Sequence, residues 1–307
     1  MAPTKPMTLA VAAVAVLVLV ASVVLLCGRS SADQYVSELD QTLSEPATPS
    51  VVLRCGTNEE RHLNADNPVV SPGIPFGAHH THEYVGNKSA DATSTNDSLA
   101  AAPTTCEKDD QSTYYWPVLR LTDGTGHDAH AEGGGLHGNT GEVLKPKSVE
   151  IRYEGSAVSD VLPMPRFLRM ITGDPMAFTN DYGPKVRAQW GCSNQPGRYT
   201  TKYPLCGSAT TLRGYDFASC WDGNNTDSAS HRTHVVFPLV GGACPPRTFP
   251  IPRLRVTVGY DVPAGRPFAI DSFPEELRDP ATDHAMFVNV MPESLMNELV
   301  GHLNRSR

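Results

Sequence analysis

Histidines occur at spacings that suit a shared site in three separate stretches of the 307-residue chain. His80 and His82 are two residues apart, so on an extended strand both imidazoles point to the same face. His231 and His234 are three residues apart, which places both rings on one side of a turn or of a helix start. His284 lies in the third stretch. Histidine is the commonest metal ligand and titrates near neutral pH, so these stretches are the first candidates for chemistry.

Converging imidazoles favour zinc or copper over calcium or magnesium, which prefer oxygen ligands. The predicted metal ligands are His80, His82, His234 and His284. Bound zinc would lower the pKa of a water molecule to about 7 and so produce a hydroxide nucleophile, whereas copper would imply redox chemistry. Glu83 or Asp227 would act as a general base or orient a ligand histidine. The predicted catalytic residues are Glu83, Asp227, His231 and Arg232. The predicted substrate is an extracellular carbohydrate.

Two other hypotheses stay open. In one, no metal takes part: His82 or His234 accepts a proton and Tyr84 donates one. Arg232 and Asn87 would then bind the carboxylate of an acidic polysaccharide. In the other, the protein is a surface-binding or structural module, and its histidines are each bonded to a backbone carbonyl. A His-x-His pattern alone does not separate a shared site from structural histidines, so the sequence leaves open whether the protein is an enzyme.

Composition excludes some classes of function. The chain carries a formal net charge of −8, whereas a nucleic-acid-binding protein needs a basic surface that releases phosphate counterions. Hydrophobic residues make up 40% and charged residues 19% of the chain, which fits a packed core and not wholesale disorder. The 25 glycines and 26 prolines predict many turns and short strands.

The N-terminal region contains an uncharged apolar run from Met7 to Cys27. As a helix it is long enough to span roughly 30 Å, the thickness of a bilayer core. It predicts a transmembrane anchor or an export signal within residues 1–32. Either alternative places the rest of the protein outside the cytoplasm, on the cell membrane as an extracellular domain or secreted. Residues 33–50 are polar and predict a stalk, and residues 51–307 form the predicted single domain.

The cysteines agree with export. Cys27 lies in the apolar run, and the body holds six more. An even number in an exported domain predicts disulfides, and the absence of a Cys-x-x-Cys spacing argues against a metal cluster. Among the possible pairings, the predicted set joins nearest neighbours: Cys55–Cys106, Cys192–Cys206 and Cys220–Cys244.

Strand patterns dominate the body. Apolar and polar residues alternate over Val149–Tyr153 and Leu254–Tyr260. Shorter strands are predicted at Trp116–Leu121, Phe167–Ile171, Val186–Trp190 and His234–Leu239. After Pro292, an apolar stripe of Leu295, Leu299, Val300 and Leu303 predicts a C-terminal helix. The predicted fold is therefore mostly β, a single sandwich or jelly-roll-like domain with irregular loops and a C-terminal helix, preceded by an N-terminal apolar helix.

A Gly/His-rich segment, Gly124–Gly141, has almost no apolar residue and predicts a surface loop. It carries His127, His130 and His137. These histidines either bind a metal loosely or reflect only the composition of the segment.

Several motifs, in order along the chain, resemble a known family. Gly77–Asn87 is similar to the family hallmark GxxHxH-[DE]-[FY]-x-G-N, and Cys220–Ser228 leads into His231–His234 in its most specific motif. Further matches are Tyr115-Trp116-Pro117, Leu168–Asp174 and Trp190–Cys192. The family is catalogued as domain of unknown function nineteen-ninety-six and contains exported bacterial and fungal proteins. The resemblance covers about residues 52–303 and implies the identity of the domain, because no reaction is assigned to the family.

The resemblance also bears on the candidate site. The histidines that match family histidines are His80, His82, His231, His234 and His284. Their agreement implies one shared polar site. His79 stands where the family usually has serine or another small polar residue. Met286 replaces an acidic residue, which weakens any carboxylate role there.

Overall fold

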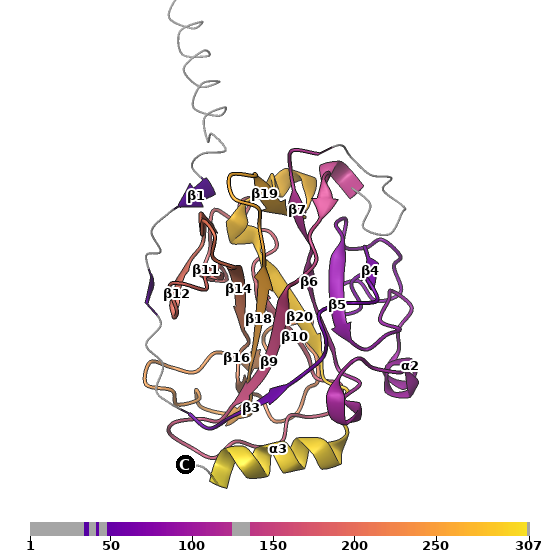
Figure 1. Ribbon diagram of the computed structural model, residues 1–307. Coiled ribbons are helices and arrows are strands. Elements are labelled where there is room, and N and C mark those ends of the chain that lie inside the picture. Colours follow the sequence, from indigo (N-terminus) through magenta and orange to yellow (C-terminus); the bar gives the residue numbers. More distant parts are fainter. Residues whose placement is uncertain (1–33, 37–40, 43–47, 125–135, 306–307) are drawn as a thin grey trace, which may run out of the picture.

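The computed structural model describes residues 34–36, 41–42, 48–124 and 136–305 (Figure 1). Within these ranges the protein is mostly β, as predicted, with five sheets of short strands and a helix at the C-terminal end. The predicted N-terminal apolar helix, including Met7 to Cys27, lies outside the described residues. Among the helices that are described, none is long and apolar enough to cross a membrane.

The largest sheet has seven strands. In spatial order they are β2 (Gln41–Thr42), β12 (Arg198–Thr200), β11 (Trp190–Cys192), β14 (Thr211–Asp216), β18 (Arg253–Tyr260), β9 (Ser148–Glu154) and β3 (Ser50–Leu53). Burial alternates residue by residue along β14 and along most of β18. This is the period of two that the sequence predicts for a sheet with one buried face.

The second sheet has five strands and carries most of the candidate residues. Its order is β10 (Arg169–Gly173), β20 (His284–Val288), β6 (Thr113–Pro117), β5 (His82–Gly86) and β4 (Leu63–Asn64). Every residue of β5, β6 and β20 is buried. Both faces of this sheet are therefore covered, one by the seven-stranded sheet and the other by loops and the short helix Asn96–Ala101 (Figure 1).

Smaller elements complete the body. The smaller sheets are β1 (Tyr35–Val36) with β13 (Tyr203–Pro204), β19 (Phe268–Ile270) with β7 (Leu119–Leu121) and β8 (Glu142–Val143), and β16 (Val235–Val236) with β15 (Cys220–Trp221) and β17 (Phe249–Pro250). The helices are α2 (Asn96–Ala101) and α3 (Glu293–Arg305), and the short 3-10 turns are η2 (Glu107–Asp109), η3 (Leu136–Gly138), η4 (Pro274–Glu276) and η5 (Pro280–Thr282). Thr95 and Ser98 form a capping box that starts α2.

The two large sheets share one core. Tyr114 of β6 and Tyr153 of β9 meet through their hydroxyl groups at 2.8 Å. The indole N–H of Trp116 donates to the hydroxyl of Tyr260 at 3.0 Å. These aromatic side chains are fully buried, and their polar atoms find partners across the core. A second apolar cluster, which includes Tyr84, Tyr115 and Met286, lies on the opposite face of the five-stranded sheet.

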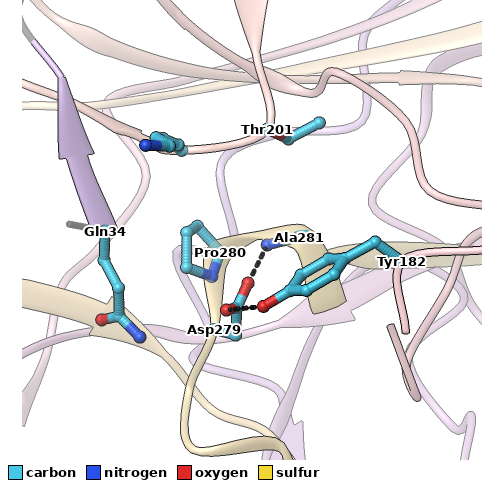
Figure 2. A pocket seen from close by; sticks show the side chains of 7 residues that line it. Gln34, Tyr182, Thr201, Asp279, Pro280 and Ala281 are labelled. Carbon is cyan, nitrogen blue, oxygen red and sulfur yellow. Dashed lines mark hydrogen bonds between the residues drawn. The ribbon is translucent and has the colours of Figure 1, made fainter. Parts of the chain in front are cut away.

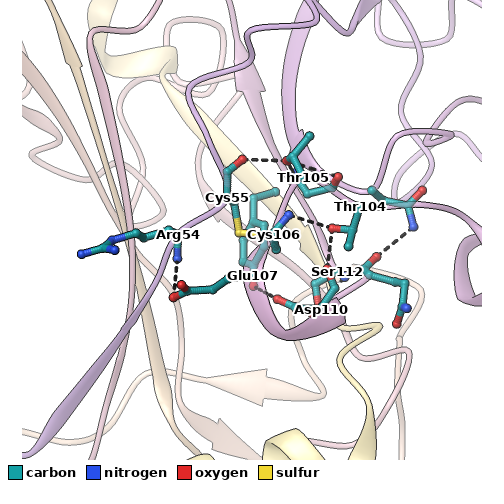
Figure 3. Close-up of a disulfide and its surroundings, with 12 residues drawn as sticks. Arg54, Cys55, Thr104, Thr105, Cys106, Glu107, Asp110 and Ser112 are labelled. Carbon is teal, nitrogen blue, oxygen red and sulfur yellow. Dashed lines mark hydrogen bonds between the residues drawn. A yellow bond between two sulfur atoms is a disulfide. The ribbon is translucent and has the colours of Figure 1, made fainter.

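The three predicted disulfides are confirmed: Cys55–Cys106, Cys192–Cys206 and Cys220–Cys244. Around Cys55–Cys106, the hydroxyl of Thr105 donates to the Cys55 carbonyl and the Cys106 amide donates to Thr104 Oγ1 (Figure 3). Three disulfides indicate a domain that folds in an oxidising, extracytoplasmic compartment.

The predicted strands and the predicted C-terminal helix agree with the structure in part. The alternating strands become β9 and β18, and the C-terminal helix becomes α3, whose apolar stripe packs beside β3. The predicted strand Trp116–Leu121 is divided between β6 and β7. Of Val186–Trp190, only Trp190 is in a strand. Tyr35, within the predicted stalk, instead packs on Tyr203 and Phe268, so part of residues 33–50 joins the body.

Candidate metal centre

Two strands place histidines at the same end of the five-stranded sheet. β5 and β20 each pair antiparallel with β6, so they run parallel to each other, one on each side of it. His82 is the first residue of β5 and His284 is the first of β20. His82 lies opposite Pro117 of β6, and the register of β20 continued by two residues places His284 opposite Pro117 as well. The topology thus brings together two residues that are far apart in sequence.

Three imidazoles converge at this end of the sheet. One ring nitrogen of each of His80, His82 and His284 lies within 4.8 Å of the others. The Nε2 atoms of His80 and His82 are 3.1 Å apart. The ring centroid of His284 lies 5.2 Å from that of His80 and 5.9 Å from that of His82. All three side chains are buried, with at most 2% exposed. This histidine group, His80 with His82 and His284, can bind a metal ion.

Backbone carbonyls fix the orientation of two of the rings. His82 Nδ1 lies 2.8 Å from the Asp66 carbonyl, and His284 Nδ1 lies 2.8 Å from the Thr282 carbonyl. A carbonyl only accepts, so each Nδ1 carries the proton and each Nε2 keeps its lone pair. An N–H held by a carbonyl, with the other nitrogen free, is the usual arrangement of a metal-bound histidine.

His80 differs because its Nδ1 makes no hydrogen bond of regular geometry. The backbone of Ala78 lies near the ring and raises the pKa of His80, against the larger lowering by burial. A buried polar atom without a partner is unfavourable. The Nε2 of His80 lies 3.1 Å from the unprotonated Nε2 of His82, so only His80 can supply a proton to this contact. Two nitrogens bound to one tetrahedral zinc ion lie about 3.3 Å apart, given bonds of about 2.0–2.1 Å. The observed separation therefore fits a shared ion.

Burial keeps the rings neutral. Desolvation lowers the pKa of His82 and that of His284 to about 3, and the positive charge of Arg213 adds to both shifts. Burial also lowers the pKa of His80 well below its usual value, and the neighbouring histidines reinforce this. Metal binding needs neutral imidazole, so the group is in its binding form without having to lose protons at neutral pH.

A buried ion pair holds the loop that carries His80 and His82. Arg120 Nε donates to Asp271 Oδ1 at 2.6 Å, and both side chains are fully buried. The other carboxylate oxygen, Oδ2, accepts from the amide of Thr81 at 3.1 Å. Thr81 lies between the two histidines, so Asp271 fixes the backbone from which both rings project.

A second buried ion pair holds the strand ends. Arg213 donates to both carboxylate oxygens of Asp283, the residue before His284, at 3.0 and 2.6 Å. It also donates to the carbonyl of Pro117 at 2.7 Å. Arg213 therefore connects β20 to the last residue of β6. Both ion pairs position the site through the backbone and do not contribute ligands.

Glu83 is on the wrong face of β5 to act on the histidine group. It alternates with His82 and is buried in the core, where its carboxylate accepts from Trp116 at 3.1 Å and from Tyr260 at 2.8 Å. Burial raises its pKa, an effect that these hydrogen bonds oppose. This geometry argues against the predicted role of Glu83 as a general base and indicates a buried link between the two large sheets.

His234, a predicted metal ligand, is not brought into the histidine group. Its Nε2 lies 2.7 Å from the Arg169 carbonyl and its Nδ1 lies 2.9 Å from Ser228 Oγ. Arg232, two residues earlier, donates to the carbonyls of Ile171 and Gly173. β10 is the edge strand of its sheet. Arg232 and His234 therefore satisfy successive outward carbonyls of that edge, which otherwise is open to pairing with another chain.

Asp227 and His231 form a separate pair. His231 Nδ1 lies 2.9 Å from Asp227 Oδ1, and both side chains are partly exposed. The backbone of His231 is left-handed, with φ of 54°. Asp227 is near enough to Tyr115 to raise the pKa of that hydroxyl, although burial is the larger cause. The pair lies beside the five-stranded sheet and contributes no nitrogen to the histidine group.

The residues of the acid–base hypothesis are also buried and bonded. The hydroxyl of Tyr84 donates to the Asp66 carbonyl at 3.0 Å, and burial raises its pKa well above the usual value. The side-chain amide of Asn87 donates to the carbonyls of Leu99 and Gln111. Neither side chain is placed to give a proton or to bind a substrate carboxylate.

Sequence reasoning missed the residues that hold the site. Asp66 and Thr282 act through backbone carbonyls, which leave no mark in the sequence. Arg120 could have been found, because it interrupts the apolar pair Leu119 and Leu121 within a predicted strand. A lone arginine in such a position is rarely left without a buried partner.

Comparison with known families agrees with the motifs. A family model described as Domain of unknown function (DUF1996) matches residues 67–280, more than half of the 307-residue chain. The match includes His80 and His82 and ends just before His284. No curated protein and no solved structure matches the chain.

Proposed function

Because the chain belongs to the DUF1996 family, whose domain has no assigned function, we propose from its own geometry that it binds one zinc or copper ion. The ligands are His80, His82 and His284, and the bound ion acts on an extracellular carbohydrate. One observation carries the proposal: two rings have Nδ1 fixed by a carbonyl, and one ring nitrogen of each of the three histidines lies within 4.8 Å of the others. Buried structural histidines normally have both nitrogens satisfied, and His80 does not.

Three histidines leave a coordination position for water or substrate, as catalytic zinc sites require. Zinc would supply a hydroxide nucleophile near neutral pH, and copper would supply redox chemistry. The chain itself supplies neutral ligands and fixed ring orientations. We assign any proton transfer to the partly exposed pair His231 and Asp227. We assign to Arg232 the role of stabilising the strand edge that includes Gly173, with no part in binding the ion.

The carbohydrate assignment is supported by a cavity of about 410 Å³ (Figure 2). Part of its lining, Asp279 to Ala281, comes shortly before His284 in the chain. It is lined by Gln34, Tyr182, Thr201, Lys202, Asp279, Pro280 and Ala281. Hydroxyl, carboxylate, amide and ammonium groups next to an aromatic ring suit a ligand with many hydroxyls. Asp279 caps η5, whose last residue, Thr282, holds His284 through its carbonyl. A sugar unit in this cavity would therefore contact η5, the segment that orients the metal ligand His284.

The test is metal analysis of the full-length protein, produced by a secretory route so that its disulfides form. We expect about one zinc or copper per chain after gentle purification, as a single site requires. His82→Asn should lose the ion. The matched control is His234→Asn, which changes a buried histidine outside the group and should keep it. Less than about 0.1 ion per chain in the unchanged protein, even after incubation with each metal, would refute the proposal.

The second candidate is a structural or binding module without catalysis. The observation that favours it is the nearly complete burial of all three rings. It predicts that His80→Ala with His82→Ala unfolds the domain and that neither zinc nor copper changes the melting temperature of the unchanged protein. The metal proposal predicts that the ion raises the melting temperature, because it binds only the folded state.

A further inference from the structure

Two exposed histidines outside the histidine group also meet. His79 Nδ1 lies 3.3 Å from His137 Nε2, and their ring centroids are 5.0 Å apart. The two residues are separated by 58 positions in the sequence. Both have left-handed backbones, with φ of 57° and 51°. Such conformations are uncommon for residues other than glycine, so the surrounding loops hold both residues in place.

The turn that carries His137 is anchored to the body. Asn139 is buried, and its side-chain amide donates to the Ser272 carbonyl at 2.8 Å. The amide of Ser272 donates back to Asn139 Oδ1 at 3.0 Å. This reciprocal pair fixes the turn next to Phe273. The meeting of the two rings therefore follows from an ordered contact between two loops.

Phe273 connects this outer pair with the buried group. Its ring centroid lies 5.8 Å from that of His79 and 5.2 Å from that of His80. His79 and His80 are adjacent in sequence, yet the first is exposed and the second is buried. Imidazoles therefore extend from the surface to the histidine group: His137, His79, His80, His82 and His284.

We propose that His79 and His137 form a second, solvent-facing site that captures a divalent zinc or copper ion before it reaches the buried group. The capture role rests on the proposed function, because it needs a buried site to load. A nitrogen separation of 3.3 Å equals the roughly 3.3 Å expected for two ligands of one tetrahedral ion. With two protein ligands, water completes the coordination, so the ion is held weakly and exchanges readily.

The experiment is zinc titration by calorimetry together with the rate of zinc uptake from a weak chelator, on the full-length protein. The unchanged protein should show a tight and a weak binding event. His79→Ser and His137→Asn should each remove the weak event and slow uptake about tenfold, since they remove the local concentration of captured ion. The final zinc content should not change. His302→Asn, at an exposed histidine of α3, is the control and should change neither quantity.

The variant His82→Asn with His284→Asn separates the two proposals. It should lose the tight event and keep the weak one. Absence of a tight event in the unchanged protein refutes the buried site, whereas a weak event that survives both His79→Ser and His137→Asn refutes the outer site. If the weak event is removed but uptake keeps its rate, the capture role is overturned.

Discussion

The two histidine motifs of this protein contact the same five-stranded sheet and use their ring nitrogens differently. In the histidine group, His82 and His284 each bond a carbonyl through Nδ1 and keep Nε2 for a common point. In the edge motif, defined as Arg232 and His234, both nitrogens of His234 already have partners. The comparison teaches that the partner of the second ring nitrogen separates a candidate ligand from a structural histidine, and that spacing does not: in His82 it is another imidazole, and in His234 it is a backbone carbonyl.

The difference follows from position in the sheet. His82 and His284 start parallel strands on the two sides of β6, where backbone groups are already paired. His234 lies beside β10, whose outward carbonyls have no strand to bond. Open carbonyls at an edge require donors. At the edge, the Nε2 of His234 therefore donates to an open strand carbonyl, whereas at the centre the Nε2 of His82 faces another imidazole.

The largest expected effect comes from making the same substitution, histidine to asparagine, in each of the two motifs. His284→Asn should weaken zinc or copper binding by more than about 100-fold. Loss of a group that only hydrogen-bonds to a metal ligand typically lowers metal affinity 10–100-fold, and loss of the ligand itself should cost more. His234→Asn should leave binding unchanged and destabilise the fold by about 1–3 kcal/mol, the penalty of leaving buried partners unpaired. Calorimetric titration and urea unfolding measure the two effects.

A reversal of these results would break the comparison. If His234→Asn lost the metal while His284→Asn kept it, the edge motif would be the binding site. If both variants lost only stability, the histidine group would be structural, and the unpaired Nδ1 of His80 would need another explanation.

Asp271→Asn is expected to have the next largest effect. It leaves the buried charge of Arg120 without its partner, which typically lowers stability by about 3–5 kcal/mol. It also weakens the hold on Thr81 between His80 and His82. Urea unfolding should show the loss. Thr81→Ala keeps the backbone contact and the ion pair and removes only the hydroxyl that accepts from Arg120 at 3.3 Å, so it should lose much less stability than Asp271→Asn. An equal loss in both variants would contradict the role of the ion pair.

Acid should destabilise the metal-free protein through the histidine group. The folded pKa of His82 and that of His284 is about 3, below the ordinary value of 6.5. Between these values the unfolded chain binds more protons, so stability falls as pH falls from about 6.5 towards 3. Each histidine contributes up to about 1.4 kcal/mol per pH unit. Urea midpoints measured across this range should fall steeply, and less steeply in His82→Asn with His284→Asn. An equal slope in both proteins would contradict neutral buried rings.

Much of the fold and part of the site could be predicted from the sequence. Alternation identified β9 and β18, and neighbouring cysteines gave the disulfides. The pairing of His82 with His284 could not be derived from spacing, because it depends on β6 lying between their strands. His234 was expected as a ligand because a sequence pattern does not reveal which carbonyls at a sheet edge lack donors.

Arg232→Ala tests the edge half of the comparison. It removes the donors to Ile171 and Gly173, and hydrogen bonds from a charged group contribute about 1.5–3 kcal/mol. We expect a loss of this size in urea unfolding, with zinc affinity unchanged. The exposed carbonyls should also favour association between chains, measurable by light scattering. Arg232→Lys is the matched variant, because it keeps the charge and one donor group. Its stability should lie between that of Arg232→Ala and that of the unchanged protein. Loss of zinc binding with full stability would place Arg232 in the metal site instead.

The smallest effect is expected for His231→Asn. The contact with Asp227 is between partly exposed side chains, and such pairs contribute about 0–1 kcal/mol. Asparagine also tolerates the left-handed backbone at this position better than most residues, so stability should change by less than about 1 kcal/mol. Zinc content should stay at the level of the unchanged protein, because His231 is not part of the histidine group. If turnover on a carbohydrate is found, this variant should lower it and shift its pH profile while leaving the metal in place. A drop in zinc content would instead place His231 among the ligands and join the two motifs into one site.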